Sequence, residues 1–176
     1  MATTKWALDP SHSEIQFKVK HMMISSITGE FTKFDAVMET EGDDFSSVKA
    51  TFSADIDSIN TKNEQRDGHL KSPDFFDAPA HPQLTFESQK LEKKDDENYI
   101  LTGNLAIKGV SKPVTLAVVN NGVIKDPYGY NRTGFEVSGK INRKDFGLTW
   151  HQVTEAGGLI VSDEIKLIAN VEFINQ

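Results

Sequence analysis

The chain has 176 residues, no cysteine and a formal net charge of −7 at pH 7. This length suffices for a domain with its own apolar core, so we expect residues 1–176 to form a single domain. The lack of cysteine excludes disulfides, thiolate metal ligands and cysteine nucleophiles. The acidic balance argues against a nucleic-acid partner, because phosphate backbones are bound by clustered lysine and arginine.

Targeting and membrane segments are not evident in the sequence. It has no apolar run of the length that a signal peptide requires, and no segment approaches the ~18 apolar residues of a transmembrane helix. We therefore expect a soluble, cytoplasmic protein. The same sequence would be periplasmic if a leader peptide had been removed from it.

Alternation of apolar and polar residues dominates the chain and predicts β-strands. The first run places Ile15, Phe17 and Val19 on one face. Further runs follow, in chain order, at 48–56, from 84 onward, at 99–107, at 135–141 and at 165–173. Turn-forming residues, such as those at 41–44 and 126–129, separate the runs.

A single apolar face on nearly every strand favours one sheet that curls around its own interior. We predict an all-β fold, an eight-stranded antiparallel barrel. Four glycines within strand patterns would permit the bends that closure requires: Gly29, Gly103, Gly134 and Gly139. The last strand alternates most cleanly, and its pairing with the same strand of a second copy would give a homodimer.

One segment departs from the strand pattern. The run Thr61-Lys62-Asn63-Glu64 has the sequence of a capping box, in which the Thr61 side chain accepts from the Glu64 amide while the Glu64 carboxylate reaches back. This predicts a helix from Thr61 through about Leu70.

A second short helical turn is predicted directly after this helix. Ser72 would be its N-cap, Pro73 would occupy its first position, and Phe75 and Phe76 would lie on it. Together the two elements predict a short helical insertion, at about residues 61–77, over one end of the barrel.

The polar residues Arg66, Asp67 and His69 on the predicted helix are the first candidates for chemistry. They could form an acid–base group, but a serine triad also needs an activated nucleophile, and the sequence has no Gly-x-Ser-x-Gly elbow. We favour a structural role, in which Arg66 and Asp67 form an ion pair or cap neighbouring strand ends, and His69 hydrogen-bonds locally.

The histidines do not have the spacing of metal ligands. The chain has five, at His12, His21, His69, His81 and His151. None forms a His-Glu-x-x-His or His-x-His pattern, so we expect no metal and no cofactor. His21 is in phase with Phe17 and is predicted to face inward near a strand end.

Arg143 lies where a predicted strand ends in a tight turn. We favour a salt-bridged barrel corner over the alternative, in which Arg143 is the counter-charge for a ligand head group.

The apolar interior is compatible with two structures. An eight-stranded barrel is either filled by side chains or holds one small apolar ligand, and small inward residues such as Ala50 and Ala169 would leave room for one. The sequence leaves both open. If the interior is a site, its candidate lining residues are Phe17, Phe31, Phe34, Phe52, Phe75, Phe76, Phe86, Leu105, Phe135, Ile141 and Phe146.

Several motifs occur in an order that is specific to one known family. They are Trp6–Ser13, Arg-Asp-x-His-Leu at 66–70, Asp-Phe-Phe-Asp at 74–77, Gly103–Val110 and Asn142–Leu148. With these motifs the chain resembles the YceI-like family of polyisoprenoid-binding proteins, essentially from end to end.

The resemblance implies an extended lipocalin-like barrel that holds a long isoprenoid chain along its interior. The family is associated with isoprenoid quinones and related prenyl lipids, and some members with stress responses. We therefore expect a protein that binds, transports or sequesters a polyisoprenoid or quinone lipid and is not an enzyme. Candidates for contact with a polar head at the barrel end are His12, Arg66, Asp67, His69 and Arg143.

Two alternatives stay open. One is an enzyme that acts on the bound lipid through Asp67 and His69. The other is a ligand-free scaffold that recognises a protein partner through an exposed apolar patch.

Overall fold

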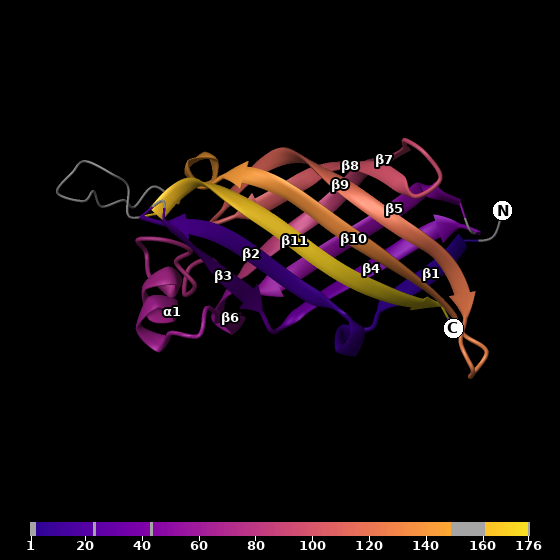
Figure 1. Cartoon of the computed structure of the whole chain (residues 1–176), viewed down its shortest axis with the longest axis horizontal. Helices are drawn as coiled ribbons and strands as arrows, with labels where there is room; N and C mark the ends of the chain where they lie inside the picture. The colour runs from indigo at the N-terminus through magenta and orange to yellow at the C-terminus, as the bar shows by residue number, and fades with distance from the viewer. Residues whose placement is uncertain (1–2, 23, 43, 149–160, 176) are drawn as a thin grey trace.

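The computed structural model describes residues 3–22, 24–42, 44–148 and 161–175. The strands wind obliquely around a long axis; helix α1 lies at one end of the molecule and both termini lie at the other (Figure 1). The elements are β1 (Thr3–Leu8), η1 (Pro10–His12), β2 (Glu14–His21), β3 (Ser25–Phe31), β4 (Phe34–Glu41), β5 (Asp44–Asp55), η2 (Ile56–Ser58), β6 (Ile59–Asn60), α1 (Glu64–Lys71), β7 (Gln83–Lys93), β8 (Asn98–Ile107), β9 (Val110–Lys125), β10 (Asn131–Asn142), η3 (Arg143–Phe146) and β11 (Val161–Asn175).

The sheet closes on itself, which confirms the predicted eight-stranded antiparallel barrel. Strands β1, β4, β5, β7, β8, β9, β10 and β11 pair in that order, and β11 pairs back to β1. The remaining strands β2, β3 and β6 continue the same sheet beyond β11. Both β1 and β2 run antiparallel to β11, so they act as one long strand that η1 interrupts.

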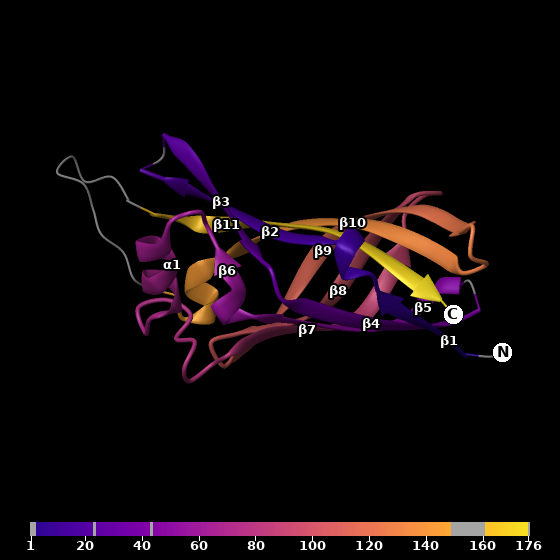
Figure 2. The ribbon, with the colours of Figure 1, turned by 90° about the horizontal axis from the view of Figure 1, so that it is seen from below.

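The interruption has a local cause. Pro10 has no amide hydrogen and cannot donate to the ladder, and the Asp9 side chain caps the short helix η1 by accepting from the Ser11 amide. Beyond this break the β2–β3 hairpin extends to the same end of the barrel as α1 (Figure 2).

The end of the barrel near the termini is filled by aromatic rings. Ring centroids of Trp6 and Phe45 lie 6.0 Å apart, those of Phe45 and Phe135 5.5 Å, and those of Phe135 and Phe173 6.0 Å. Trp6 is 1% exposed, and its indole N–H donates to the Thr40 hydroxyl at 3.1 Å. We call these four rings the far-end cluster.

A second apolar cluster lies at the α1 end. There Phe31 contacts Phe17 and Phe76, with centroid separations of 5.7 and 6.3 Å. Phe75 and Phe146 belong to the same cluster. The helical insertion is therefore held to the barrel by apolar packing.

The start of α1 differs from the sequence prediction. The helix begins at Glu64 and its N-cap is Asn63, whose side-chain oxygen accepts from the Arg66 amide at 3.0 Å. The Thr61 capping box is wrong, because the Thr61 hydroxyl instead donates to the Asp67 carboxylate at 2.5 Å.

The predicted second helical turn is also not a helix. Ser72 is the C-cap of α1, and its hydroxyl donates to the His69 carbonyl at 2.5 Å instead of capping a new helix. The residues that follow form hydrogen-bonded turns, in which the Phe75 amide donates to the Ser72 carbonyl at 3.0 Å. Phe75 and Phe76 nevertheless reach the barrel, as predicted, because these turns direct both rings into the cluster.

Strand β11 has neighbours along both of its edges. It pairs with β10 on one side and with β2 and β1 on the other. The expectation that this strand pairs across a dimer is therefore wrong in that form, since its backbone groups are used within the barrel.

Close packing of two strands depends on Gly103. A Cβ atom here would collide with the Phe86 ring and with the Glu87 carbonyl oxygen. We expect Gly103→Ala to lower the free energy of unfolding by about 1–3 kcal/mol through overpacking. Urea denaturation measures this.

Gly68 offers the matched control. It lies inside α1, and a Cβ there meets no atom within 4 Å. Gly68→Ala should raise the free energy of unfolding by about 0.5–1 kcal/mol, because alanine restricts the unfolded chain more than glycine does. Equal effects of the two substitutions would contradict the packing argument.

Candidate functional site

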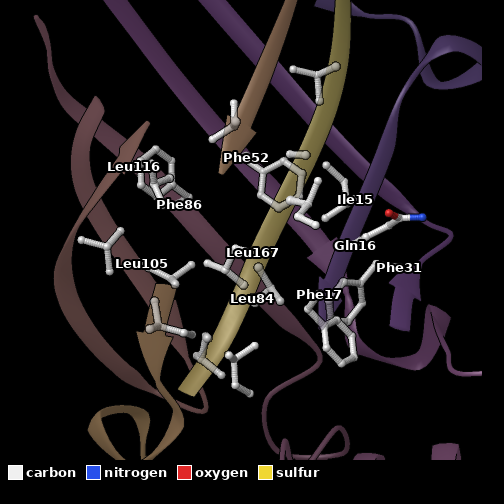
Figure 3. A pocket seen from close by; sticks show the side chains of 18 of the residues that line it. Ile15, Gln16, Phe17, Phe31, Phe52, Leu84, Phe86, Leu105, Leu116 and Leu167 are labelled. Carbon is white, nitrogen blue, oxygen red and sulfur yellow. The ribbon is translucent and has the colours of Figure 1, made fainter. Parts of the chain in front are cut away.

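Between the two apolar clusters the barrel encloses a cavity of about 420 Å³. This lies within the range of about 300–1,000 Å³ that is typical of small-molecule pockets. Side chains such as Phe52, Phe86 and Leu167 point into it from opposite walls (Figure 3). The interior is thus filled at one end and hollow along its middle.

Small side chains leave this space open. Ala36, Ala50 and Ala169 are part of the lining, each on the inward face of a strand where a larger residue would occupy the hollow. In the sequence, the alternation of small and large inward residues was the feature that made an internal pocket possible.

Most of the predicted lining residues line the cavity: Phe17, Phe31, Phe52, Phe75, Phe76, Phe86, Leu105, Phe135 and Ile141. Two do not belong to this lining. Phe34 packs against Phe52 with centroids 6.4 Å apart, and Phe146 is 1% exposed inside the cluster at the α1 end. Phe34 is the first residue of β4 and Phe146 is the last residue of η3, and neither is part of the cavity lining.

Most of the polar residues in the lining lie at the α1 end. They include Thr61, Arg66, His69 and His21, the last confirming the inward orientation predicted for it. The His69 side chain is 39% exposed, whereas the far-end cluster is buried. The cavity therefore opens toward the surface at the α1 end.

Arg66 and Asp67 meet at Thr61. Arg66 donates through Nε to the Thr61 hydroxyl at 2.8 Å and through Nη2 to the Thr61 carbonyl at 2.6 Å. The Asp67 carboxylate accepts from the Thr61 hydroxyl at 2.5 Å and from the Thr61 amide at 2.9 Å. The expected direct ion pair is thus replaced by a bridge through Thr61, and within the described part of the chain Arg66 forms no ion pair with a carboxylate.

His69 is oriented by a different carboxylate. Its Nε2 lies 3.0 Å from Asp74 Oδ2, and its ring packs edge-on to Phe75 with centroids 5.1 Å apart. Asp67 and His69, proposed from sequence as one acid–base group, are therefore each hydrogen-bonded to a separate partner.

Arg143 is a structural corner residue, as favoured from the sequence. It is 1% exposed and donates to the carbonyls of Ser162 at 3.0 Å and Leu148 at 2.6 Å. Its Nη2 lies 3.5 Å from Asp163 Oδ1. Burial lowers the pKa of the Arg143 guanidinium, and the Asp163 charge opposes this in part. Arg143 also contributes to the cavity wall.

His12 does not lie at the cavity opening, so that expectation is wrong. It is on η1, which packs against the part of β11 close to the C-terminus, and its side chain is 63% exposed. Its Nδ1 lies 2.8 Å from Asp9 Oδ2 and 3.5 Å from Glu172 Oε2. The break at Pro10 turns this part of the chain to the outside of the barrel, which the strand pattern did not indicate.

Arg132 occupies the centre of this group. Its Nη1 lies 2.8 Å from Asp9 Oδ2 and 2.9 Å from Glu172 Oε2, and its Nε lies 2.8 Å from Asp126 Oδ2. We call these residues, with His12, the Arg132 cluster. Sequence reasoning missed Arg132, because its partner Asp9 is 123 positions away and no local pattern connects the two.

Asp9, His12 and Glu172 form the one group of potential metal ligands found among the described residues. The Arg132 guanidinium already bridges both carboxylates, so the cation of this group is the arginine. His151, the fifth histidine, lies outside the described residues.

The Arg132 cluster shifts the pKa values of its acidic and its basic members in opposite directions. Hydrogen bonds from Ser11, His12 and Arg132 hold the pKa of Asp9 well below its usual range. The hydrogen bond to Asp9, with the charges of Asp9 and Glu172, raises the pKa of His12. Charged His12 is therefore favoured in the folded state.

Comparison with known proteins gives matches that cover nearly the whole chain. The family model described as a YceI-like domain matches residues 6–173. A UPF0312 protein of Staphylococcus aureus (strain N315) is 41% identical over 171 residues, which cover 97% of each chain.

Several solved structures are similar in fold. The Campylobacter jejuni YCEI protein has a TM-score of 0.77 and 38% identity, covering 89% of each chain. A polyisoprenoid binding domain from Saccharophagus degradans, implicated in plant cell wall breakdown, has a TM-score of 0.69 and 15% identity, covering 97% of this chain and 98% of that one.

In the described part of the chain, none of the helices has both the length and the apolar character needed to span a bilayer.

The opposite pKa shifts predict a pH-dependent effect of His12→Gln. Because the folded pKa of His12 is raised, its stabilising contribution is complete below the ordinary pKa of about 6.5 and is lost as the pH rises through the folded pKa. We expect a lower urea midpoint than that of the parent protein at pH 5.5, and a difference that shrinks toward pH 9.

The control experiment repeats His12→Gln in a variant whose Asp9 carboxylate has already been removed. In an Asp9→Asn background, His12→Gln should change the midpoint little at either pH, since the main hydrogen bond to His12 is already weakened. A pH-independent effect of His12→Gln in the parent protein would show that the ion pair does not contribute.

Proposed function

Since this chain belongs to the YceI-like family, we propose that it binds a polyisoprenoid lipid, such as a prenyl chain or an isoprenoid quinone, inside its barrel. The observation that carries the proposal is the cavity, whose lining is apolar apart from a few side chains, most of them at the α1 end. A domain of the same fold from Saccharophagus degradans is a polyisoprenoid binding domain, which supports this class of ligand.

The chemistry of the lining matches a hydrocarbon tail. Burial of each methylene group contributes about 0.8 kcal/mol, so about ten prenyl carbons would contribute on the order of 8 kcal/mol. This corresponds to a dissociation constant near 1 μM before the costs of ordering are subtracted. Affinity would therefore come from the tail and tolerate variation in its chemistry.

Discrimination between lipids requires polar contacts, and these lie at the opening. Arg66 places a guanidinium beside the cavity while bonding only to neutral oxygens of Thr61 within the described part of the chain. A head group with carbonyl or phosphate oxygens would accept hydrogen bonds from such a group. His69, held by Asp74, is the second donor or acceptor at this end.

The alternative is an enzyme that acts on the bound lipid through Asp67 and His69. The two side chains are oriented by Thr61 and Asp74 respectively, and both bonds attach the insertion to itself. These structural partners support a role in shaping the opening. We therefore propose binding, for transport or storage of the lipid, without catalysis.

Organic extraction of the purified protein, followed by mass spectrometry, tests the proposal. We expect a prenyl lipid in the extract of the parent protein. Ala169→Phe should reduce its amount at least tenfold, because the new ring occupies the cavity that Ala169 lines.

The matched control is Asn170→Phe, which adds the same ring to the exposed face of the same strand. It should leave the extracted lipid unchanged. An extract of the parent protein without prenyl lipid, or equal losses in the two variants, would contradict binding in the cavity.

A further inference from the structure

The tip of the β2–β3 hairpin carries exposed apolar side chains. Met22 is 38% exposed and Ile24 is 81% exposed. Their neighbours His21 and Ile27 line the cavity, so the tip continues directly from the cavity wall. The hairpin and α1 lie at the same end of the molecule, away from the termini (Figure 2).

These residue types are not those that an exposed tight turn favours. Met22 has φ of 50°, in the left-handed region where glycine, asparagine and aspartate are preferred. The Ile24 amide closes the turn by donating to the His21 carbonyl at 3.2 Å. The turn therefore presents apolar side chains to the solvent at positions where small polar residues are the common choice.

A row of lysines crosses the outer wall that leads to this tip. Lys18 on β2 lies opposite Lys166 on β11, and Lys166 lies opposite Lys140 on β10. All three are exposed, as is Lys20 two residues further toward the tip. We call the first three the lysine row.

Like charges directly opposite one another on neighbouring strands repel. Among the described residues, the lysine row takes part in one ion pair, between Lys140 and Glu164 at 3.9 Å. The chain as a whole carries a net charge of −7, so the lysine row is a local cluster of positive charge on an acidic protein. An anionic surface against the wall would relieve the repulsion.

We propose that the open end of the barrel docks on an anionic lipid bilayer. Met22 and Ile24 enter the headgroup region, and the lysine row faces the anionic headgroups. The purpose of this contact rests on the proposed function, since a polyisoprenoid has its source in a bilayer and its tail could then enter the cavity without crossing water.

A bilayer fits this surface better than a folded protein partner does. A stable protein interface buries about 800 Å² on each partner with an apolar core. Among its described residues the hairpin tip offers two exposed apolar side chains, and the lysine row lies on the strands that lead to it; that combination is typical of peripheral membrane contacts.

Vesicle co-sedimentation with the full chain tests the proposal. The vesicles contain phosphatidylglycerol and phosphatidylcholine but no prenyl lipid, so the assay does not depend on the ligand. We expect binding at low salt that weakens with added salt, because exposed charges are screened over about 10 Å at 0.1 M. Two double variants should each weaken vesicle binding at least tenfold. One is Met22→Ser with Ile24→Ser, and the other is Lys18→Gln with Lys166→Gln.

The control variants change the same residue types at the other end of the barrel. Ile124 is 70% exposed near the end of β9, and Lys125 follows it. Ile124→Ser and Lys125→Gln should leave vesicle binding unchanged. Circular dichroism of each variant verifies the fold, and Ile24→Ser alone replaces the double variant if that one does not fold.

Absence of vesicle binding by the parent protein would overturn the proposal, as would equal loss in the hairpin and control variants. Uptake of a prenyl lipid from detergent micelles separates the two proposals. Vesicle binding without such uptake would overturn the proposed function alone, and uptake without vesicle binding would overturn the docking proposal alone.

Discussion

The closure of one sheet on itself is the constraint on which the rest of the structure depends. Because β11 returns to β1, the inward faces of all the strands converge on one interior, and the outward faces hold the charged residues. Aromatic rings fill that interior at the end near the termini, where Trp6 and Phe135 lie, and alanines leave its middle hollow. The cavity is thus a consequence of which residues the alternation directs inward.

The helical insertion determines how the hollow interior meets the solvent. Phe75 and Phe76 contribute to the apolar lining, while Thr61, Arg66 and His69 place polar groups at the opening. Asp67 holds Arg66 in position indirectly, since both side chains hydrogen-bond to Thr61. Asp74 holds His69 by a direct hydrogen bond. Apolar burial and polar recognition are therefore separated along the axis of the barrel, as an amphiphilic ligand requires.

The sequence predicted the strands and the inward residues well, because a period of two leaves a clear local pattern. Of the polar residues, it predicted that Arg143 is a corner but misplaced His12, since the break at Pro10 moves that side chain to the outer wall. Arg132 could not be found, because its partners come together only when the barrel closes. The cap at Asn63 was missed because Asn63 and Thr61 are both good N-caps, and only the contact of Thr61 with Asp67 decides between them.

The central claim is that the cavity binds a hydrocarbon tail along its length. Titration of the delipidated protein with a series of prenols of increasing chain length tests it most directly. The affinity should rise by up to about fourfold for each added buried carbon and level off when the cavity is filled. An affinity that is independent of chain length from the shortest prenol onward would contradict the account.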